Sequence, residues 1–177
     1  MKMIITQILG AVALIVCLIG IFFNKKKNYI ITQIISYVFN GAAFIVNGSL
    51  VAGINTIVSI SRALVLYFYE RKGKNPPTII ILICYSAIYL TIGIVFMSDY
   101  LEIITMITPI LFTLSMLMKN MQLIRYYSLL PNVMLATYGF LTAAYTSASF
   151  YVVQTIALIV AIINHYIQRK KQRNYII

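Results

Sequence analysis

The chain has 177 residues, of which 62% are hydrophobic and 10% are charged, and its mean hydropathy is +0.93. A soluble domain of this size needs a polar exterior that this composition cannot supply, so the sequence predicts an integral membrane protein embedded in a lipid bilayer. The net charge of +11 would suggest nucleic-acid binding in a soluble protein. Here the basic residues stand in short runs between apolar segments, which fits membrane topology and anionic headgroups and argues against a nucleic-acid partner.

Seven apolar segments are long enough to cross roughly 30 Å of hydrocarbon as helices. The predicted spans are residues 3–23, 29–47, 51–69, 78–97, 101–118, 128–146 and 150–168. Barrel strands would be shorter and would alternate in polarity, so we expect an all-α membrane protein. The clearest break is GKNPP at 73–77, because its two prolines cannot continue the preceding helix.

The first span has some features of a signal sequence, namely Lys2, an apolar run and Cys17. However, Val16 rather than a small residue precedes the cysteine, and apolar sequence continues to Phe23. We therefore interpret this segment as a retained membrane span.

The charges of the predicted loops alternate along the chain. Of the 14 basic residues, all but Lys2 and Arg62 fall after the first, third, fifth and seventh spans, whereas Asp99 and Glu102 follow the fourth. The loops after the second and sixth spans carry no charge. By the positive-inside rule the N-terminus lies outside and the C-terminus lies in the cytoplasm, which an odd number of spans satisfies.

The first and last three spans resemble an internal repeat. A shift of 99 residues places IIT at 4–6 on IIT at 103–105 without a gap, and it also matches the loop charges of the two triplets. The same shift pairs Asn55 with Gln154 and Gly10 with Pro109. A parallel repeat of this kind makes the fourth span a linker that restores orientation for the second copy.

Two stretches carry a resemblance to a known family: FFNKKKNYIITQIISYVFNGAAFIVNGSLVAGINTIVSISRALVL at 22–66 and EIITMITPILFTLSMLM at 102–118. They contain the short lysine loop, the Asn47–Gly48 turn, the helix with Arg62, and the helix with Glu102 and a downstream proline. In these features the chain is similar to the YgjV-type bacterial inner membrane protein family. The resemblance implies a multi-pass protein of the bacterial inner (plasma) membrane and no particular biochemical activity.

The 3+1+3 order of spans resembles the SWEET/PQ-loop class of seven-span facilitators in architecture. This resemblance implies two parallel three-helix bundles, at 1–72 and 99–177, joined by a linker helix at 73–98. It also implies that polar residues of the third and seventh helices lie near the substrate, here Asn55 and Gln154. The chain has no tryptophan, which sugar-carrying members commonly use for stacking, and this argues against a sugar substrate.

Arg62 lies about eleven residues into the third span, so it is roughly 17 Å deep and near the midplane. An arginine at this depth costs at least about 2.5–3.5 kcal/mol on insertion scales. One interpretation is a cation that faces a cavity and binds an anionic or carbonyl-bearing ligand, or pairs in a gate. The alternative is a structural role, with the side chain snorkelling or bonded to backbone carbonyls.

Polar residues at helical spacing form stripes on the second and third spans, which points to a polar site at mid-depth. The alternative is that these side chains join helices to one another. The predicted substrate-binding residues are Gln33, Tyr37, Asn40, Asn55, Ser59, Arg62, Asn132, Gln154 and Thr155.

Pro109 should kink its helix, as a hinge for alternating access together with Gly10 or as a static kink. His165, near the cytoplasmic end of the last span, is a candidate for proton coupling or a bystander. Asp99 and Glu102 are expected at the outer mouth.

Signatures of catalysis and of cofactor binding are absent from the sequence. Cys17 and Cys84 lie in apolar spans without CxxC spacing, so we expect neither a disulfide nor a metal site. There is no HExxH, GxSxG or phosphate-binding glycine loop, and three acidic residues and one histidine leave little for acid–base chemistry. No enzyme activity and no cofactor are predicted.

The sequence therefore favours a membrane facilitator or transporter for a small polar solute, neutral or anionic, bound at mid-depth between two bundles. The alternative is a non-transporting receptor or assembly protein on the same scaffold. Oligomeric state stays open, because both bundles lie in one chain.

Overall fold

The computed structural model describes residues 2–48, 50–96 and 100–174. They form seven α-helices and one short 3₁₀ helix, with no β-strand in these ranges. The elements are α1 (Lys2–Phe22), α2 (Lys26–Asn47), α3 (Leu50–Arg71), α4 (Thr78–Phe96), η1 (Tyr100–Glu102), α5 (Ile103–Leu117), α6 (Met121–Leu141) and α7 (Tyr145–Asn174). The predicted all-α class is confirmed.

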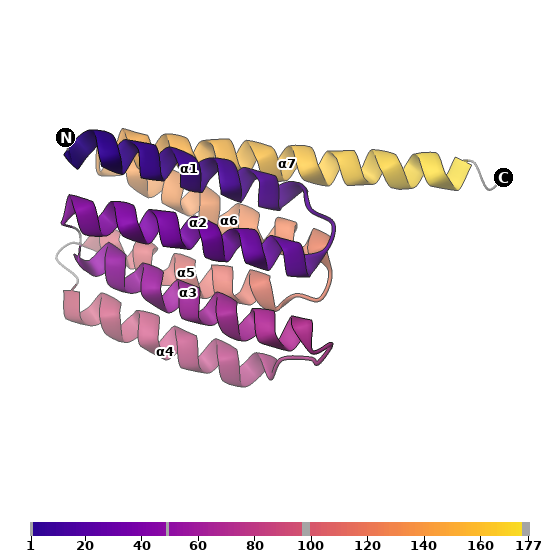
Figure 1. Ribbon diagram of the computed structural model, residues 1–177, viewed down its shortest axis with the longest axis horizontal. Coiled ribbons are helices and arrows are strands. Elements are labelled where there is room, and N and C mark those ends of the chain that lie inside the picture. Colours follow the sequence, from indigo (N-terminus) through magenta and orange to yellow (C-terminus); the bar gives the residue numbers. More distant parts are fainter. Residues whose placement is uncertain (1, 49, 97–99, 175–177) are drawn as a thin grey trace.

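Six of these helices are long and apolar enough to cross a membrane, with η1 and α5 counted as one segment, Tyr100–Leu117. α6 is not among the six, although its 21 residues match the others in length. Its polar residues include Arg125, Ser128 and Asn132, and all three are buried against other helices. α6 packs between α5 and α7 within the bundle (Figure 1). The neighbouring helices therefore shield much of its polar surface from lipid.

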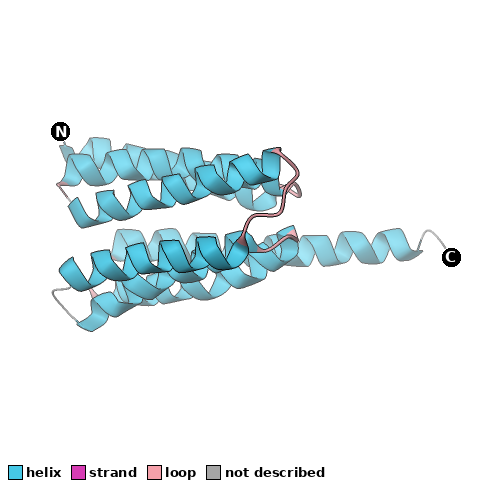
Figure 2. Cartoon of the chain, turned by 90° about the horizontal axis from the view of Figure 1, so that it is seen from below, coloured by secondary structure: helices cyan, strands magenta, loops and turns pink. Residues whose placement is uncertain are grey.

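Helices that are neighbours in sequence also pack together. α1 packs on α2 and α2 on α3, while α5 packs on α6 and α6 on α7. The two triplets meet where α1 contacts α7 and where α3 contacts α5, which closes a ring of six helices. α4 lies at the edge of the molecule, packed mainly on α5 and less on α3 (Figure 1). Viewed from the side of α4, the helices lie in two groups, with the two termini in different groups (Figure 2).

These contacts fit the predicted 3+1+3 division, which itself stays a prediction. Its first boundary falls in the connection between α3 and α4, and its second falls within residues 97–99, outside the described ranges.

The two ends of the bundle differ in charge. The connections after α1, α3 and α5 lie together at one end, here called the basic end, with Lys25, Lys72, Lys74 and Lys119 (Figure 1). The start of α1 and the ends of α2, α4 and α6 lie at the other end, here called the N-terminal end. α7 continues past the basic end and stands clear of the other helices. Basic and neutral loops are therefore separated as the charge alternation predicted.

The sixth helix begins earlier than its predicted start at residue 128. Asn120 caps it, because its side chain accepts a hydrogen bond of 2.9 Å from the backbone N–H of Gln122. Arg125, predicted in a basic loop, is instead a residue of α6 and only 2% exposed. The prediction of a longer loop was wrong, because the polar start of α6 is accommodated by contacts with other helices.

Arg125 caps the end of α1. Its Nε donates to the carbonyl oxygen of Ile21 at 3.0 Å, and its Nη2 donates to that of Phe23 at 3.1 Å. The last carbonyls of a helix lack partners within the helix, and a cation is favourable there. This arginine therefore links the second triplet to the first.

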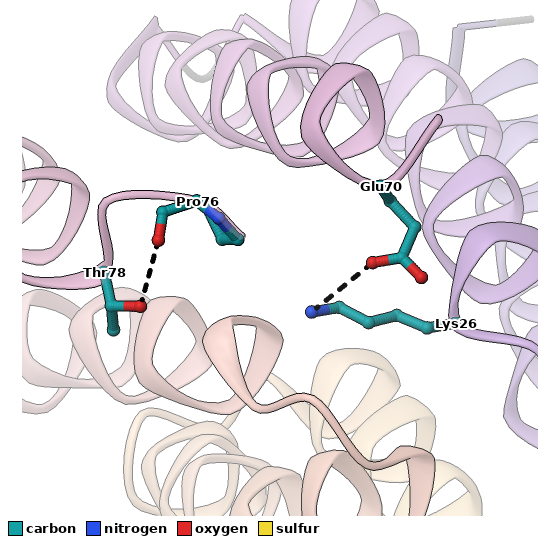
Figure 3. A network of polar contacts seen from close by, with 4 residues as sticks. All are labelled: Lys26, Glu70, Pro76 and Thr78. Atoms are coloured by element: carbon teal, nitrogen blue, oxygen red, sulfur yellow. Dashed lines mark hydrogen bonds and ion pairs between the residues drawn. The ribbon is translucent and has the colours of Figure 1, made fainter. Parts of the chain in front are cut away.

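Further polar contacts tie helix ends together at the basic end. Lys26 Nζ lies 3.9 Å from Glu70 Oε2, which pairs the start of α2 with the last turn of α3 (Figure 3). Thr78 Oγ1 donates to the carbonyl oxygen of Pro76 at 3.3 Å, where α4 begins. The first contact therefore joins α2 to α3, and the second is local to the start of α4.

Two clusters of buried side chains fill the ring toward the basic end. The first has members on each of the five helices from α2 through α6 and consists of Tyr29, Ile30, Ala63, Leu66, Ile81, Met116, Leu117, Met121 and Ile124. The second joins α1 to α7 and consists of Cys17, Ile21, Ala157, Leu158 and Ala161. Within lipid, such interfaces depend on close packing of side chains.

Candidate solute-binding cavity

A cavity of about 980 Å³ lies within the helix ring, and all seven helices contribute to its lining. Gln7, Asn47 and Ser147 line it near the N-terminal end and are exposed, so the cavity opens there. On α3 the lining ends at Arg62, and on α4 it begins only at Tyr89. The cavity therefore narrows toward the basic end, where its lining on α1 and α2 runs on to Ile21 and Tyr29, which are buried members of the two apolar clusters.

Arg62 lies at mid-depth in this lining and is 1% exposed. Its Nη1 donates to the carbonyl oxygen of Pro109 at 3.0 Å and to Thr113 Oγ1 at 2.8 Å. Its Nη2 donates to the hydroxyl of Tyr37 at 3.2 Å. The guanidinium carbon also lies 5.9 Å from the ring centroid of Tyr89, within the range of a cation–π interaction.

The arginine thus connects α3 with α2, α4 and α5, and all of these partners are uncharged. The two predicted roles of Arg62 are therefore combined in one residue, since it lines a cavity and also bonds to a backbone carbonyl. Its Nε–H is buried and has no hydrogen-bond acceptor.

The polar stripe of α3 continues from Arg62 toward the mouth. Asn55, Ser59 and Arg62 all line the cavity, as their spacing predicted. Ser59 Oγ donates to the carbonyl oxygen of Asn55 at 2.9 Å and also bonds to the hydroxyl of Tyr89 at 2.9 Å. The side-chain oxygen of Asn55 is buried and has no hydrogen-bond partner.

Asn132 presents a second unpaired acceptor on the opposite triplet. It is 2% exposed, and its Nδ2 donates to the carbonyl oxygen of Ser128 in the preceding turn at 2.7 Å. Its Oδ1 has no partner. Ser128 Oγ donates to Ser115 Oγ at 3.1 Å, which anchors this part of α6 to α5.

The structure brings the other predicted binding residues into the same lining with one exception. Gln33, Tyr37, Asn40 and Gln154 all line the cavity, and Gln33 Nε2 also donates to Cys17 Sγ at 3.4 Å. Thr155 is not among the lining residues, because it lies on another face of α7 and donates to the carbonyl oxygen of Tyr151 at 2.8 Å.

Both predicted hinge residues also border the cavity. Gly10 faces open space, since a Cβ built there would meet no atom within 4 Å outside its own surroundings in α1. Pro109 lies inside α5, and its carbonyl accepts from Arg62 and, at 2.7 Å, from Thr113 Oγ1.

Sequence reasoning missed several tyrosines of the lining. Tyr29 precedes Gln33 by four residues and Tyr151 precedes Gln154 by three, so each lies on the face of a residue that was predicted. Helical spacing extended by one turn would have found both. Tyr89 and Tyr138 lie outside the predicted stripes and carried no such signal.

The remaining candidates lie elsewhere. His165 borders a separate pocket of about 100 Å³ at the basic end, together with Arg125, Asn24 and Asn164. Glu102 lines the main cavity, as expected near its mouth, and Asp99 lies outside the described residues. Within the described ranges, both cysteines are free and no three metal-ligating side chains gather.

A family model described as bacterial inner membrane protein, Imp-YgjV, matches residues 4–170. The matched region includes the whole cavity lining and all but the last turn of α7. No curated protein and no solved structure matches the chain.

Proposed function

The chain belongs to the Imp-YgjV family of bacterial inner membrane proteins, and on that premise we propose that it is a facilitator for a small polar solute. The observation that supports this most directly is the shape of the cavity. It opens at one end of the bundle, holds polar side chains at mid-depth and ends on packed apolar side chains. A central site open to one side and closed to the other is what alternating access requires.

We further propose that the N-terminal end faces the outside. The connections at the opposite end carry the basic residues, and the positive-inside rule places such loops in the cytoplasm. In this orientation the cavity is open outward, and the two apolar clusters form the inner closure.

In this proposal Arg62 couples binding to movement. A solute with a hydrogen-bond acceptor competes with Pro109 and Thr113 for the guanidinium, and these two residues are its links to α5. Breaking these bonds between α3 and α5, with Pro109 and Gly10 as flexible points, would let the two triplets move relative to each other about the site. The role is not enzymatic, and any driving force comes from solute or ion gradients.

The test is solute counterflow in proteoliposomes. Purified protein is reconstituted with a panel of unlabelled organic anions, amino acids, nucleosides and polyols inside, and uptake of the matching labelled compound is followed. We expect one class to accumulate with wild-type protein and not with Arg62→Ala. Thr137→Ala is the matched control, because Thr137 lies exposed on the outer face of α6 and should not affect uptake.

The second candidate is a receptor or assembly protein on the same scaffold. The helix α7 extends beyond the basic end, where it is free to meet a partner. Saturable binding of a solute that depends on Arg62, without any counterflow in sealed vesicles, would favour this role.

A further inference from the structure

We infer that the solute is a small carboxylate that also carries hydroxyl donors, that is, a hydroxy acid. The inference rests on the proposed function and names its substrate class. It starts from three buried polar atoms that lack partners and belong to residues of one cavity: Arg62 Nε, Asn55 Oδ1 and Asn132 Oδ1. Buried polar atoms of folded proteins are nearly always paired, so three at one cavity point to a binding site for a polar ligand.

The charge of Arg62 specifies the first group of the solute. Its hydrogen-bond and cation–π partners are a carbonyl, two hydroxyls and an aromatic ring, none of which carries a negative charge. A buried cation is costly unless an anion accompanies it. Glu102 stands two turns before Pro109, so it lies roughly 10 Å nearer the mouth. A carboxylate that accepts from Nε–H would supply both the missing acceptor and the missing negative charge.

The two asparagine oxygens specify the rest of the solute. Each is an acceptor, so the solute must bring O–H or N–H donors to them. Hydroxyls fit better than an ammonium group, because the amide oxygens carry no full charge and Arg62 repels a second cation.

The depths of these atoms set the order of the groups. Asn55 precedes Arg62 by two turns of α3, roughly 10 Å along the axis, and so lies nearer the mouth. The carboxylate therefore lies at the depth of Arg62, and the hydroxyl that meets Asn55 lies toward the N-terminal end. Asn132 stands eleven residues into α6, at about the depth of Arg62, so a second hydroxyl meets it across the cavity. Gluconate, an open chain with one carboxylate and a row of hydroxyls, is a suitable probe.

The experiment is a thermal-shift titration of the full-length protein in detergent with three matched probes. Gluconate has both groups, sorbitol has the hydroxyls without the carboxylate, and hexanoate has the carboxylate without the hydroxyls. We expect gluconate to raise Tm saturably and the other two probes to leave it within error, since a ligand of the native state stabilises it by mass action.

The variants Asn55→Leu and Asn132→Leu separate a ligand role from a structural one. Each removes an unpaired buried acceptor, and Asn132→Leu also removes the bond of Nδ2 to the carbonyl of Ser128 in its own helix. The unliganded variants should therefore melt close to or above the wild-type Tm while the gluconate shift disappears. Thr137→Val is the control on the same helix as Asn132, because Thr137 makes the same type of bond to the preceding turn (Thr137 Oγ1 to Val133 O, 2.9 Å) and is exposed. It should keep the full gluconate shift.

Three results would overturn the inference: an equal shift with sorbitol, no shift with any probe, or an unchanged gluconate shift in Asn132→Leu. None of these removes the proposed facilitator role, which fails separately if no member of the counterflow panel accumulates in proteoliposomes.

Discussion

Arg62 and Pro109 are joined by a hydrogen bond of 3.0 Å from the guanidinium to the backbone carbonyl. Thr113 completes a triangle, since its hydroxyl accepts from Arg62 at 2.8 Å and donates to the same carbonyl at 2.7 Å. The contact between α3 and α5 is therefore held by hydrogen bonds at the proline of α5. The same group that would receive a solute also holds the two triplets together.

Replacing Arg62 should weaken the fold measurably. Arg62→Leu removes charge-assisted hydrogen bonds to Tyr37, Thr113 and Pro109, and we expect a loss of about 1.5–3 kcal/mol in the free energy of unfolding. The stability of Arg62→Lys should lie between those of Arg62→Leu and the wild type, because a single ammonium group cannot reach partners on two sides. Unfolding in mixed detergent micelles measures this. A leucine variant as stable as wild type would mean that the side chain serves the ligand alone.

Arg125 should matter for the end of α1. Arg125→Leu leaves the carbonyls of Ile21 and Phe23 without their donors, with an expected cost of about 1–3 kcal/mol. Hydrogen exchange should rise in the last turn of α1 and leave α3 unaffected. Lys119→Leu removes the same charge at the same end from an exposed position and should change stability by less than about 0.5 kcal/mol. Equal effects of the two substitutions would contradict the capping role.

Two glycines should respond in opposite directions to alanine. A Cβ on Gly139 would lie 2.9 Å from the backbone nitrogen of Ala148, so Gly139→Ala should force α6 and α7 apart at a cost of about 1–3 kcal/mol. A Cβ on Gly10 would lie in open space on a helix, so Gly10→Ala should raise the free energy of unfolding by about 0.5–1 kcal/mol. Thermal denaturation compares the two. Counterflow that survives unchanged in Gly10→Ala would show that α1 needs no hinge there.

The proposed orientation can be read from single cysteines placed at the two ends. In a Cys17→Ala, Cys84→Ala background, Ala144→Cys lies in the exposed turn after α6 and Asn75→Cys in the exposed connection after α3. A membrane-impermeant maleimide should label position 144 in intact spheroplasts and position 75 only after lysis. The reverse pattern would invert the assignment of inside and outside.

Sequence was sufficient for the helices because length, apolar composition and proline breaks act locally. It was insufficient for the start of α6, where Gln122, Arg125 and two tyrosines look like a polar loop. Arg125 is tolerated there because the carbonyls of α1, about a hundred residues earlier, accept its hydrogen bonds. Such distant compensation leaves no local pattern.

The candidate site was likewise predictable where the signal was local and not where it depended on packing between distant segments. A lone arginine in an apolar span indicated Arg62, and helical spacing added Asn55, whereas Gln154 followed from the internal repeat and from the resemblance in architecture. The partners of Arg62 on α5 could not be foreseen from the sequence. Pro109 and Thr113 follow Arg62 by 47 and 51 residues, so these contacts depend on how α3 and α5 pack against each other. Thr155 was predicted as one of the polar residues of the last span, and this prediction was wrong because it lies on a face of α7 that does not line the cavity.

The uncharged surroundings of Arg62 have an electrical consequence. A cation fixed near the middle of the bilayer senses part of the membrane potential, for which a full crossing is worth about 2.3 kcal/mol per 100 mV for each charge. With a bound monoanion the centre becomes electroneutral, whereas the empty centre keeps its charge. In a carrier built this way, voltage acts on the return of the empty protein and leaves the loaded step nearly unaffected.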